Sequence, residues 1–205
     1  MTTIVAVRHG ETTWNRERRM QGWAPTPLTD VGCEQATTLG GALDTRYDID
    51  RIYSSDLHRT EETTELLLDH VDAPVTYESA WREHDIGIYQ GLPADEMFER
   101  FPEYGVWEVG AEAAYREPES GETLASVRER VVDRWERLLV DCEPSETVLV
   151  VSHGNPIRFL LGHVKGLELT AALEQSQGNC AINEFQYDPD AETTKVVCEN
   201  ETDYS

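Results

Sequence analysis

Residues 4–12 read IVAVRHGET, an apolar run that ends at Arg8, His9 and Gly10. A short run of β-branched and apolar residues predicts a buried strand. Open α/β sheets bind their ligands outside the carboxyl ends of the strands. A cation and an imidazole at such an end predict that this strand leads into a functional site. The question is which other residues join His9 there.

Strand-like and helix-like segments alternate along the rest of the chain. Strands are expected at residues 3–8, 51–54, 75–77, 147–151, 180–187 and 194–199. Helices are expected from the N-cap Thr29 to about 47, from Ser55 or Asp56 to about 70, at 93–101, at 122–140 and after the N-cap Asn155. This alternation predicts a three-layer α/β/α sandwich with a mostly parallel central sheet and an antiparallel edge strand.

The length of 205 residues suits one core of substantial size. We expect a single domain, 1–205, in which the irregular, acidic and aromatic residues 82–120 form an insert that caps the site. No stretch approaches the roughly 20 apolar residues of a membrane span. The N-terminus lacks the basic region of a signal peptide. A cytoplasmic protein is therefore the expectation.

The charge balance is strongly acidic. Asp and Glu number 40 against 17 Lys and Arg, and the formal net charge is −23. Such a surface repels phosphate backbones and anionic lipids, so neither a nucleic acid nor a membrane is an expected partner. We interpret the acidity as adaptation to a salt-rich cytoplasm, where a Debye length of roughly 3 Å at 1 M salt screens the repulsion between surface carboxylates.

The four cysteines give no sign of a metal site. Cys33, Cys142, Cys180 and Cys198 form no C-x-x-C pair, so a zinc site is not expected. Cys180 and Cys198 fall in the two expected C-terminal strands, and the sequence leaves open whether they pair.

Three polar motifs follow predicted strands: Arg8-His9-Gly10, Ser54–Arg59 and Ser152-His153-Gly154. Parallel strands place their carboxyl ends at one edge of the sheet, so the three motifs should meet there. Two of the motifs open predicted helices, whose N-terminal N–H groups favour anions. Arginines, histidines and helix N-termini in one crevice are typical of a phosphate site.

The motifs follow one another in an order that resembles the histidine phosphatase superfamily, in its phosphoglycerate mutase-like branch. The resemblance extends over residues 4–155 and depends on an ordered series, not on one motif. Its members are Arg8–Thr12 with Asn15 and Gln21-Gly22, Pro27–Gly32, Ser54–Thr60, Arg82–Gly91, Gly121–Thr123 and Val151–Gly154.

The resemblance implies a role for each matching residue. His9 would be the nucleophile that becomes phosphorylated, and Glu83 the proton donor and acceptor. Phosphoryl oxygens would be held by Arg8, Arg59 and His153. Asn15 would add a hydrogen bond, and Gln21 and Gly22 would lie near the substrate.

These roles agree with the chemistry of phosphoryl transfer, which needs positioning and neutralisation of spread negative charge. Two guanidiniums and a protonated imidazole supply that charge without a metal or cofactor. The attacking nitrogen of His9 must be neutral, so a hydrogen bond at the other nitrogen must fix the tautomer. A backbone carbonyl near Gly10 is the expected acceptor.

The superfamily includes phosphatases and mutases. Residues 82–120 hold few arginines and many carboxylates, whereas a phosphoglycerate mutase needs extra cations. The mutases resemble one another in a Glu-Arg-His-Tyr-Gly segment at the proton-donating glutamate. Here Glu83 is followed instead by His84 and Asp85. We therefore favour a phosphatase acting on a small phosphorylated metabolite. A mutase dependent on 2,3-bisphosphoglycerate and a non-catalytic phospho-ligand module are the alternatives. The natural substrate and the oligomeric state, including a homo-oligomer, stay open.

Overall fold

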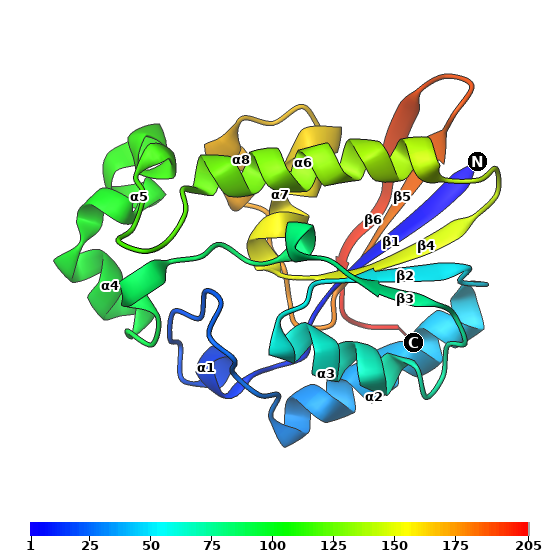
Figure 1. The fold of residues 1–205 in the computed structure, drawn as a ribbon, viewed down its shortest axis with the longest axis horizontal. Coiled ribbons are helices and arrows are strands. Elements are labelled where there is room, and N and C mark those ends of the chain that lie inside the picture. The colour runs from blue at the N-terminus through cyan, green and yellow to red at the C-terminus, as the bar shows by residue number, and fades with distance from the viewer. Residues whose placement is uncertain (205) are drawn as a thin grey trace.

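The computed structural model describes residues 1–204. Within them one sheet has the strand order β3-β2-β4-β1-β5-β6 (Figure 1). The strands are β1 (Thr2–Arg8), β2 (Arg51–Ser54), β3 (Val75–Tyr77), β4 (Thr147–Ser152), β5 (Ile182–Asp188) and β6 (Thr193–Glu201). The first four are mutually parallel, while β5 is antiparallel to β1 and β6 to β5. The predicted mixed sheet is confirmed.

Helices cover both faces of the sheet, as the predicted sandwich requires (Figure 1). One face packs on α2 (Asp30–Arg46) and α3 (His58–Leu67), and the other on α6 (Leu124–Asp141), α7 (Gly154–Val164) and α8 (Leu169–Leu173). Alternation along β1 explains the two cores: Ile4 and Ala6 join the α6 side, whereas Val5 and Val7 join the α2 side. A central strand buried on both faces is expected to be apolar throughout.

The helix starts agree with the sequence in part. Thr29 caps α2, where its side chain accepts from the Gly32 N–H at 3.0 Å. The expected Ser55 or Asp56 cap of α3 is wrong, because that helix begins at His58 and Leu57 holds the N-cap position. The Asn155 cap of α7 is also wrong. His153 is the N-cap there, since β4 runs into the helix without an intervening turn.

A one-turn helix, α1 (Thr13–Arg16), lies in the segment that the sequence predicts to be a loop. Thr12 and Asn15 form a capping box around it, which satisfies the first free N–H groups. The short turn follows the Arg8-His9-Gly10 motif directly and fixes the chain beyond it.

Residues 82–120 lie beyond the carboxyl ends of the parallel strands (Figure 1). The segment begins after η1 (Ser79–Trp81) and contains η2 (Gly87–Tyr89), α4 (Ala94–Arg100), η3 (Pro102–Tyr104), α5 (Val106–Val109) and η4 (Gly110–Tyr115). The helix predicted at 93–101 is thus confirmed as α4. Gly87 has φ +53°, and a Cβ there would lie 1.9 Å from the Glu119 carbonyl oxygen. A glycine is therefore required where the two ends of the segment meet.

No helix within residues 1–204 has both the length and the apolar character that crossing a bilayer requires. All four cysteines are free thiols, so Cys180 and Cys198 are not bonded to each other. Burial raises the pKa of the Cys180 thiol to about 12, which keeps it protonated near neutral pH.

The net charge of −23 predicts a fold that is stabilised by salt. The melting temperature should rise between low and molar KCl, by about 2–4 °C for each kcal/mol of repulsion that the ions screen. Differential scanning calorimetry measures this rise. As a matched control, a variant with glutamine at the exposed Glu99, Glu112, Glu117 and Glu119 should melt higher in low salt and respond less to KCl. A melting temperature independent of KCl would refute the interpretation.

Candidate active site

The strand register brings the three polar motifs to one edge of the sheet. Arg8 is opposite Ser152, and Ser54 is opposite Val151. The pairing continues one residue further, because the His9 N–H donates to the Ser152 carbonyl at 3.1 Å and the Ser55 N–H to the Val151 carbonyl at 2.9 Å. The side chains that follow β1, β2 and β4 therefore start from adjacent backbone positions.

His9 is buried, with 2% of its surface exposed. Its Nδ1 lies 2.7 Å from the Gly10 carbonyl oxygen, the acceptor expected from the sequence. Arg59 Nε donates to His9 Nε2 at 3.2 Å. Nδ1 therefore holds the proton and Nε2 presents a lone pair. Burial, with the charges of Arg59 and Arg8, lowers the pKa of His9 well below its usual value, so the ring is neutral near pH 7.

Two guanidiniums flank this ring, and backbone carbonyls hold them. Arg59 donates to the Gly22 carbonyl at 2.9 Å and the Ala24 carbonyl at 3.4 Å. Arg8 donates from Nη1 to the Gln177 carbonyl at 2.7 Å. Neither forms an ion pair with a described residue, and the charge of Glu83 raises the pKa of both only from a longer distance. Burial lowers the pKa of each to about 10, so both stay cationic.

His153 is fully buried, and its ring centroid lies 5.2 Å from that of His9. Its Nε2 lies 2.8 Å from Ser55 Oγ, which also accepts from the Leu57 N–H at 3.3 Å. Burial, together with Arg59, His9 and Arg8, lowers the pKa of His153 well below its usual value. The expectation of a protonated imidazole is therefore wrong for the free site, because the ring is buried beside cations.

Two polar atoms of the site are buried without a hydrogen-bond partner among the described residues: Arg8 Nε and His153 Nδ1. Ser55 Oγ accepts from the Leu57 N–H and has no other acceptor for its hydrogen among the described residues, so we assign that hydrogen to His153 Nε2 and the neutral ring's proton to Nδ1. Both orphan atoms are then donors. A buried donor that is left without a hydrogen bond costs about 1–3 kcal/mol of stability. An anion bound beside His9 would satisfy both, with Arg59 as a third donor.

Glu83 lies at the start of the 82–120 segment and faces the first turn of α7. Its Oε1 accepts from the His84 N–H at 2.8 Å, and its Oε2 from the Asn155 N–H at 3.3 Å. The Trp23 indole donates to the Glu83 carbonyl at 2.7 Å. Arg82 binds Asp56 through two contacts of 2.6 Å. The Glu83 backbone is therefore fixed on both sides.

The other predicted residues divide into two groups. Gln21 and Gly22 line a cavity of about 150 Å³ together with Arg8, His9, Arg59 and Glu83. Asn15 does not line this cavity. Its Oδ1 accepts from Asn179, whose amide also donates to the His9 carbonyl at 3.0 Å. Asn15 thus lies behind His9 and supports its backbone.

Sequence reasoning missed Ser55, Gln177 and Asn179 as parts of the site. Ser55 belongs to a recognised motif, but its hydroxyl binds His153 in addition to the Leu57 N–H at the start of α3. Gln177 and Asn179 lie in an irregular segment before β5 that has no motif. Their nearness to Arg8 and His9 follows from the antiparallel pairing of β5 with β1, which a sequence pattern does not specify in atomic detail.

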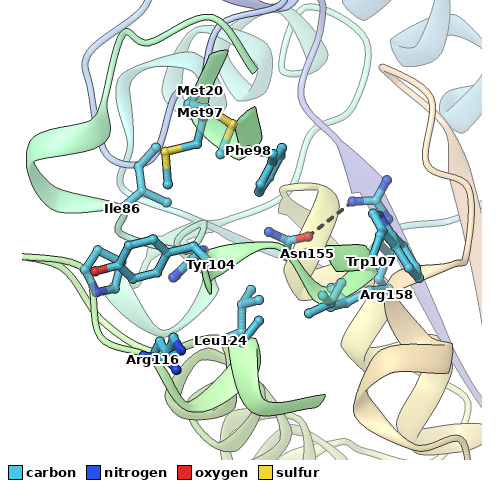
Figure 2. Close-up of a pocket in the computed structure, with 15 residues that line it drawn as sticks. Met20, Ile86, Met97, Phe98, Tyr104, Trp107, Arg116, Leu124, Asn155 and Arg158 are labelled. Atoms are coloured by element: carbon cyan, nitrogen blue, oxygen red, sulfur yellow. Dashed lines mark hydrogen bonds between the residues drawn. The ribbon is translucent and has the colours of Figure 1, made fainter. Parts of the chain in front are cut away.

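A second cavity of about 390 Å³ adjoins the first and shares Met20, His84, Ile86 and Asn155 with it. Figure 2 shows its walls, in which Met97, Phe98, Tyr104 and Trp107 come from the 82–120 segment. Arg116 and Arg158 line opposite sides. Among the described residues no Asp or Glu lines this cavity, and the smaller one has Glu83 alone.

Comparisons with known proteins agree with this geometry. The sequence model of the histidine phosphatase superfamily (branch 1) matches residues 4–200. The chain is 33% identical, over 91% of its length and 86% of the other protein, to the probable phosphoglycerate mutase GpmB of Salmonella arizonae.

Solved structures of the same architecture are also similar. YhfR of Bacillus stearothermophilus has a TM-score of 0.86 at 28% identity, covering 100% of this chain and 99% of that one. A mycobacterial glucosyl-3-phosphoglycerate phosphatase, solved with VO3, has a TM-score of 0.80 at 27% identity, covering 97% and 98%.

The lowered pKa of His9 predicts that its ring is still neutral at pH 6, since a depressed pKa moves protonation to lower pH. In ¹⁵N NMR, His9 should keep the Nδ1–H tautomer from pH 8 to pH 6. The His9→Ala protein assigns the signal by its loss. A titration centred near the ordinary histidine value of about 6.5 would contradict the buried, cation-flanked ring.

Proposed function

The chain belongs to the histidine phosphatase superfamily (branch 1), and we propose that it is a metal-independent phosphatase of small phosphate monoesters that works through a phosphohistidine on His9. The observation that supports this most is the pair of orphan buried atoms, Arg8 Nε and His153 Nδ1, on two side chains that are neighbours of the neutral His9 ring. A phosphoryl group on His9 would offer acceptor oxygens to donors of this kind.

In the first half-reaction His9 Nε2 attacks the phosphorus atom. The N–P bond forms while the bond from phosphorus to the ester oxygen breaks. Arg59 transfers its hydrogen bond from Nε2 to a phosphoryl oxygen, and Arg8 and His153 donate to the others. Protonated Glu83 gives its proton to the leaving oxygen, which departs as an alcohol. Donors aimed at developing charge in a dry site are the main source of rate in such transfers.

In the second half-reaction water attacks the phosphohistidine. The ionised Glu83 takes a proton from the water, the N–P bond breaks, and the electron pair returns to His9 Nε2. Inorganic phosphate leaves and Glu83 is again protonated. The Gly10 carbonyl keeps the Nδ1–H proton throughout. Gln21 and Gly22 contact the bound ester, and Asn15 acts by positioning the His9 backbone through Asn179.

A phosphoglycerate mutase is the second candidate, because GpmB carries that name. The acidic residues of 82–120 do not disfavour a mutase as the sequence suggests, because apart from Glu83 they line neither cavity. The phosphatase is still favoured for two reasons. The arginine and tyrosine of the mutase segment are absent after Glu83, and the mycobacterial neighbour is a phosphatase.

A phosphoenzyme trap tests the proposal. Wild-type protein quenched with a ³²P-labelled monoester should hold acid-labile, base-stable label, with and without EDTA. His9→Ala should hold none. Glu83→Gln should still bind ester but turn over more slowly by about 10²–10⁴, the usual contribution of general acid–base catalysis. The exposed Arg137→Met serves as the control for changes outside the site.

The outcomes separate the three candidate functions. Label on His9→Ala, or loss of label with EDTA, would refute the mechanism. Ester binding without turnover in wild type would indicate a non-catalytic module. Isomerisation of 3-phosphoglycerate, stimulated by 2,3-bisphosphoglycerate and faster than release of phosphate, would establish the mutase. We expect phosphate release to dominate.

A further inference from the structure

The charge of the larger cavity is opposite to that of the protein. The chain holds 40 acidic and 17 basic residues. Yet among residues 1–204 the cavity of about 390 Å³ is lined by Arg116 and Arg158 and by no carboxylate. Burial lowers the pKa of His84 and the pKa of Tyr104 is raised, so both of these ionisable groups are neutral near pH 7. The cavity is thus an apolar chamber with two positive groups.

Arg158 is held in place but not neutralised. On α7, its Nε donates to the Gln175 carbonyl at 2.7 Å and its Nη1 to Asn155 Oδ1 at 3.2 Å, the bond drawn in Figure 2. No ion pair joins it to a carboxylate of the described residues, and the nearby charge of Glu83 raises its pKa without direct contact. Its remaining N–H groups have no protein acceptor within residues 1–204. A guanidinium fixed in this way can bind a carboxylate through parallel hydrogen bonds.

Arg158 is also close to the reacting groups. A Cβ placed on Gly154 would lie 3.5 Å from Arg158 Nη1, 3.7 Å from Glu83 Oε2 and 3.9 Å from Arg8 Nε. The three side chains therefore surround one point of the α7 backbone. A leaving group whose ester oxygen meets Glu83 enters the chamber beside Arg158.

We propose that the substrate's leaving group carries a carboxylate, which Arg158 binds while the apolar body of the group packs against the 82–120 segment. This inference rests on the proposed phosphatase function and adds the substrate class. Arg116 is exposed and lies on the opposite wall, so it is the less desolvated of the two arginines. Bonds to the more buried Arg158 therefore contribute more to recognition.

Matched esters test the inference: carboxyphenyl phosphate against its neutral isostere carbamoylphenyl phosphate, each in the meta and para series. In wild type, kcat/KM should favour the carboxylate in at least one series. Arg158→Met should reduce that preference about 10- to 100-fold, the range for lost hydrogen bonds to a charged group. Arg158→Lys should retain part of it. Arg137→Met, which removes the same charge from the exposed face of α6, should leave it unchanged.

Calorimetry on the His9→Ala background separates this inference from the proposed function, because it needs no turnover. That protein should bind the carboxylate ester more tightly than the amide, and Arg158→Met should abolish the difference. Tighter binding of the carboxylate ester than of the amide, together with no phosphoenzyme in wild type, would refute the proposed phosphatase function and still support a carboxylate site at Arg158. No preference in either series, or an equal preference in Arg158→Met and Arg137→Met, would overturn the inference. If Arg158 had a purely structural role, Arg158→Met would lower kcat/KM for the carboxylate ester and for the amide ester equally.

Discussion

The site depends on two guanidinium groups that are buried next to a histidine without a carboxylate partner. Arg8 and Arg59 keep their charges because their pKa values remain at about 10. Their field and the loss of solvent keep His9 and His153 neutral. A neutral His9 is a nucleophile, and positive charge that no carboxylate neutralises by direct contact is a receptor for a phosphoryl group, although Glu83 offsets part of it from a longer distance. One electrostatic constraint therefore sets both the reactivity and the ligand.

Backbone carbonyls make this arrangement tolerable. Gly22 and Ala24 accept from Arg59, and Gln177 accepts from Arg8. A carbonyl satisfies a guanidinium N–H without neutralising it, whereas an aspartate would cancel the charge that the substrate requires. The carbonyls come from two loops far apart in sequence, after α1 and before β5. The positions of those loops depend on the sheet register and on contacts such as Asn179 to the His9 carbonyl.

The sequence was sufficient for what local pattern determines. Apolar runs predicted the strands, Thr29 predicted the start of α2, and the motifs after β1, β2 and β4 predicted which side chains meet. The sequence was not sufficient where one polar group binds two different partners. Ser55 resembles a helix cap, yet its hydroxyl is bound to His153. Composition also misled: the acidic residues of 82–120 are counted in the sequence, but the fold turns all except Glu83 away from both cavities.

The contrast between exterior and site has a further physical consequence. A net charge of −23 repels anionic esters over a distance set by the Debye length, roughly 10 Å at 0.1 M salt and 3 Å at 1 M. The attraction of Arg8 and Arg59 acts at contact distance in a buried site, where salt screens far less. Added salt thus removes the long-range repulsion and leaves most of the short-range attraction. An acid-rich surface and an anion-binding centre are compatible because their electrostatic effects act over different distances. High salt increases this difference, because it screens the long-range repulsion more strongly than the attraction at contact distance.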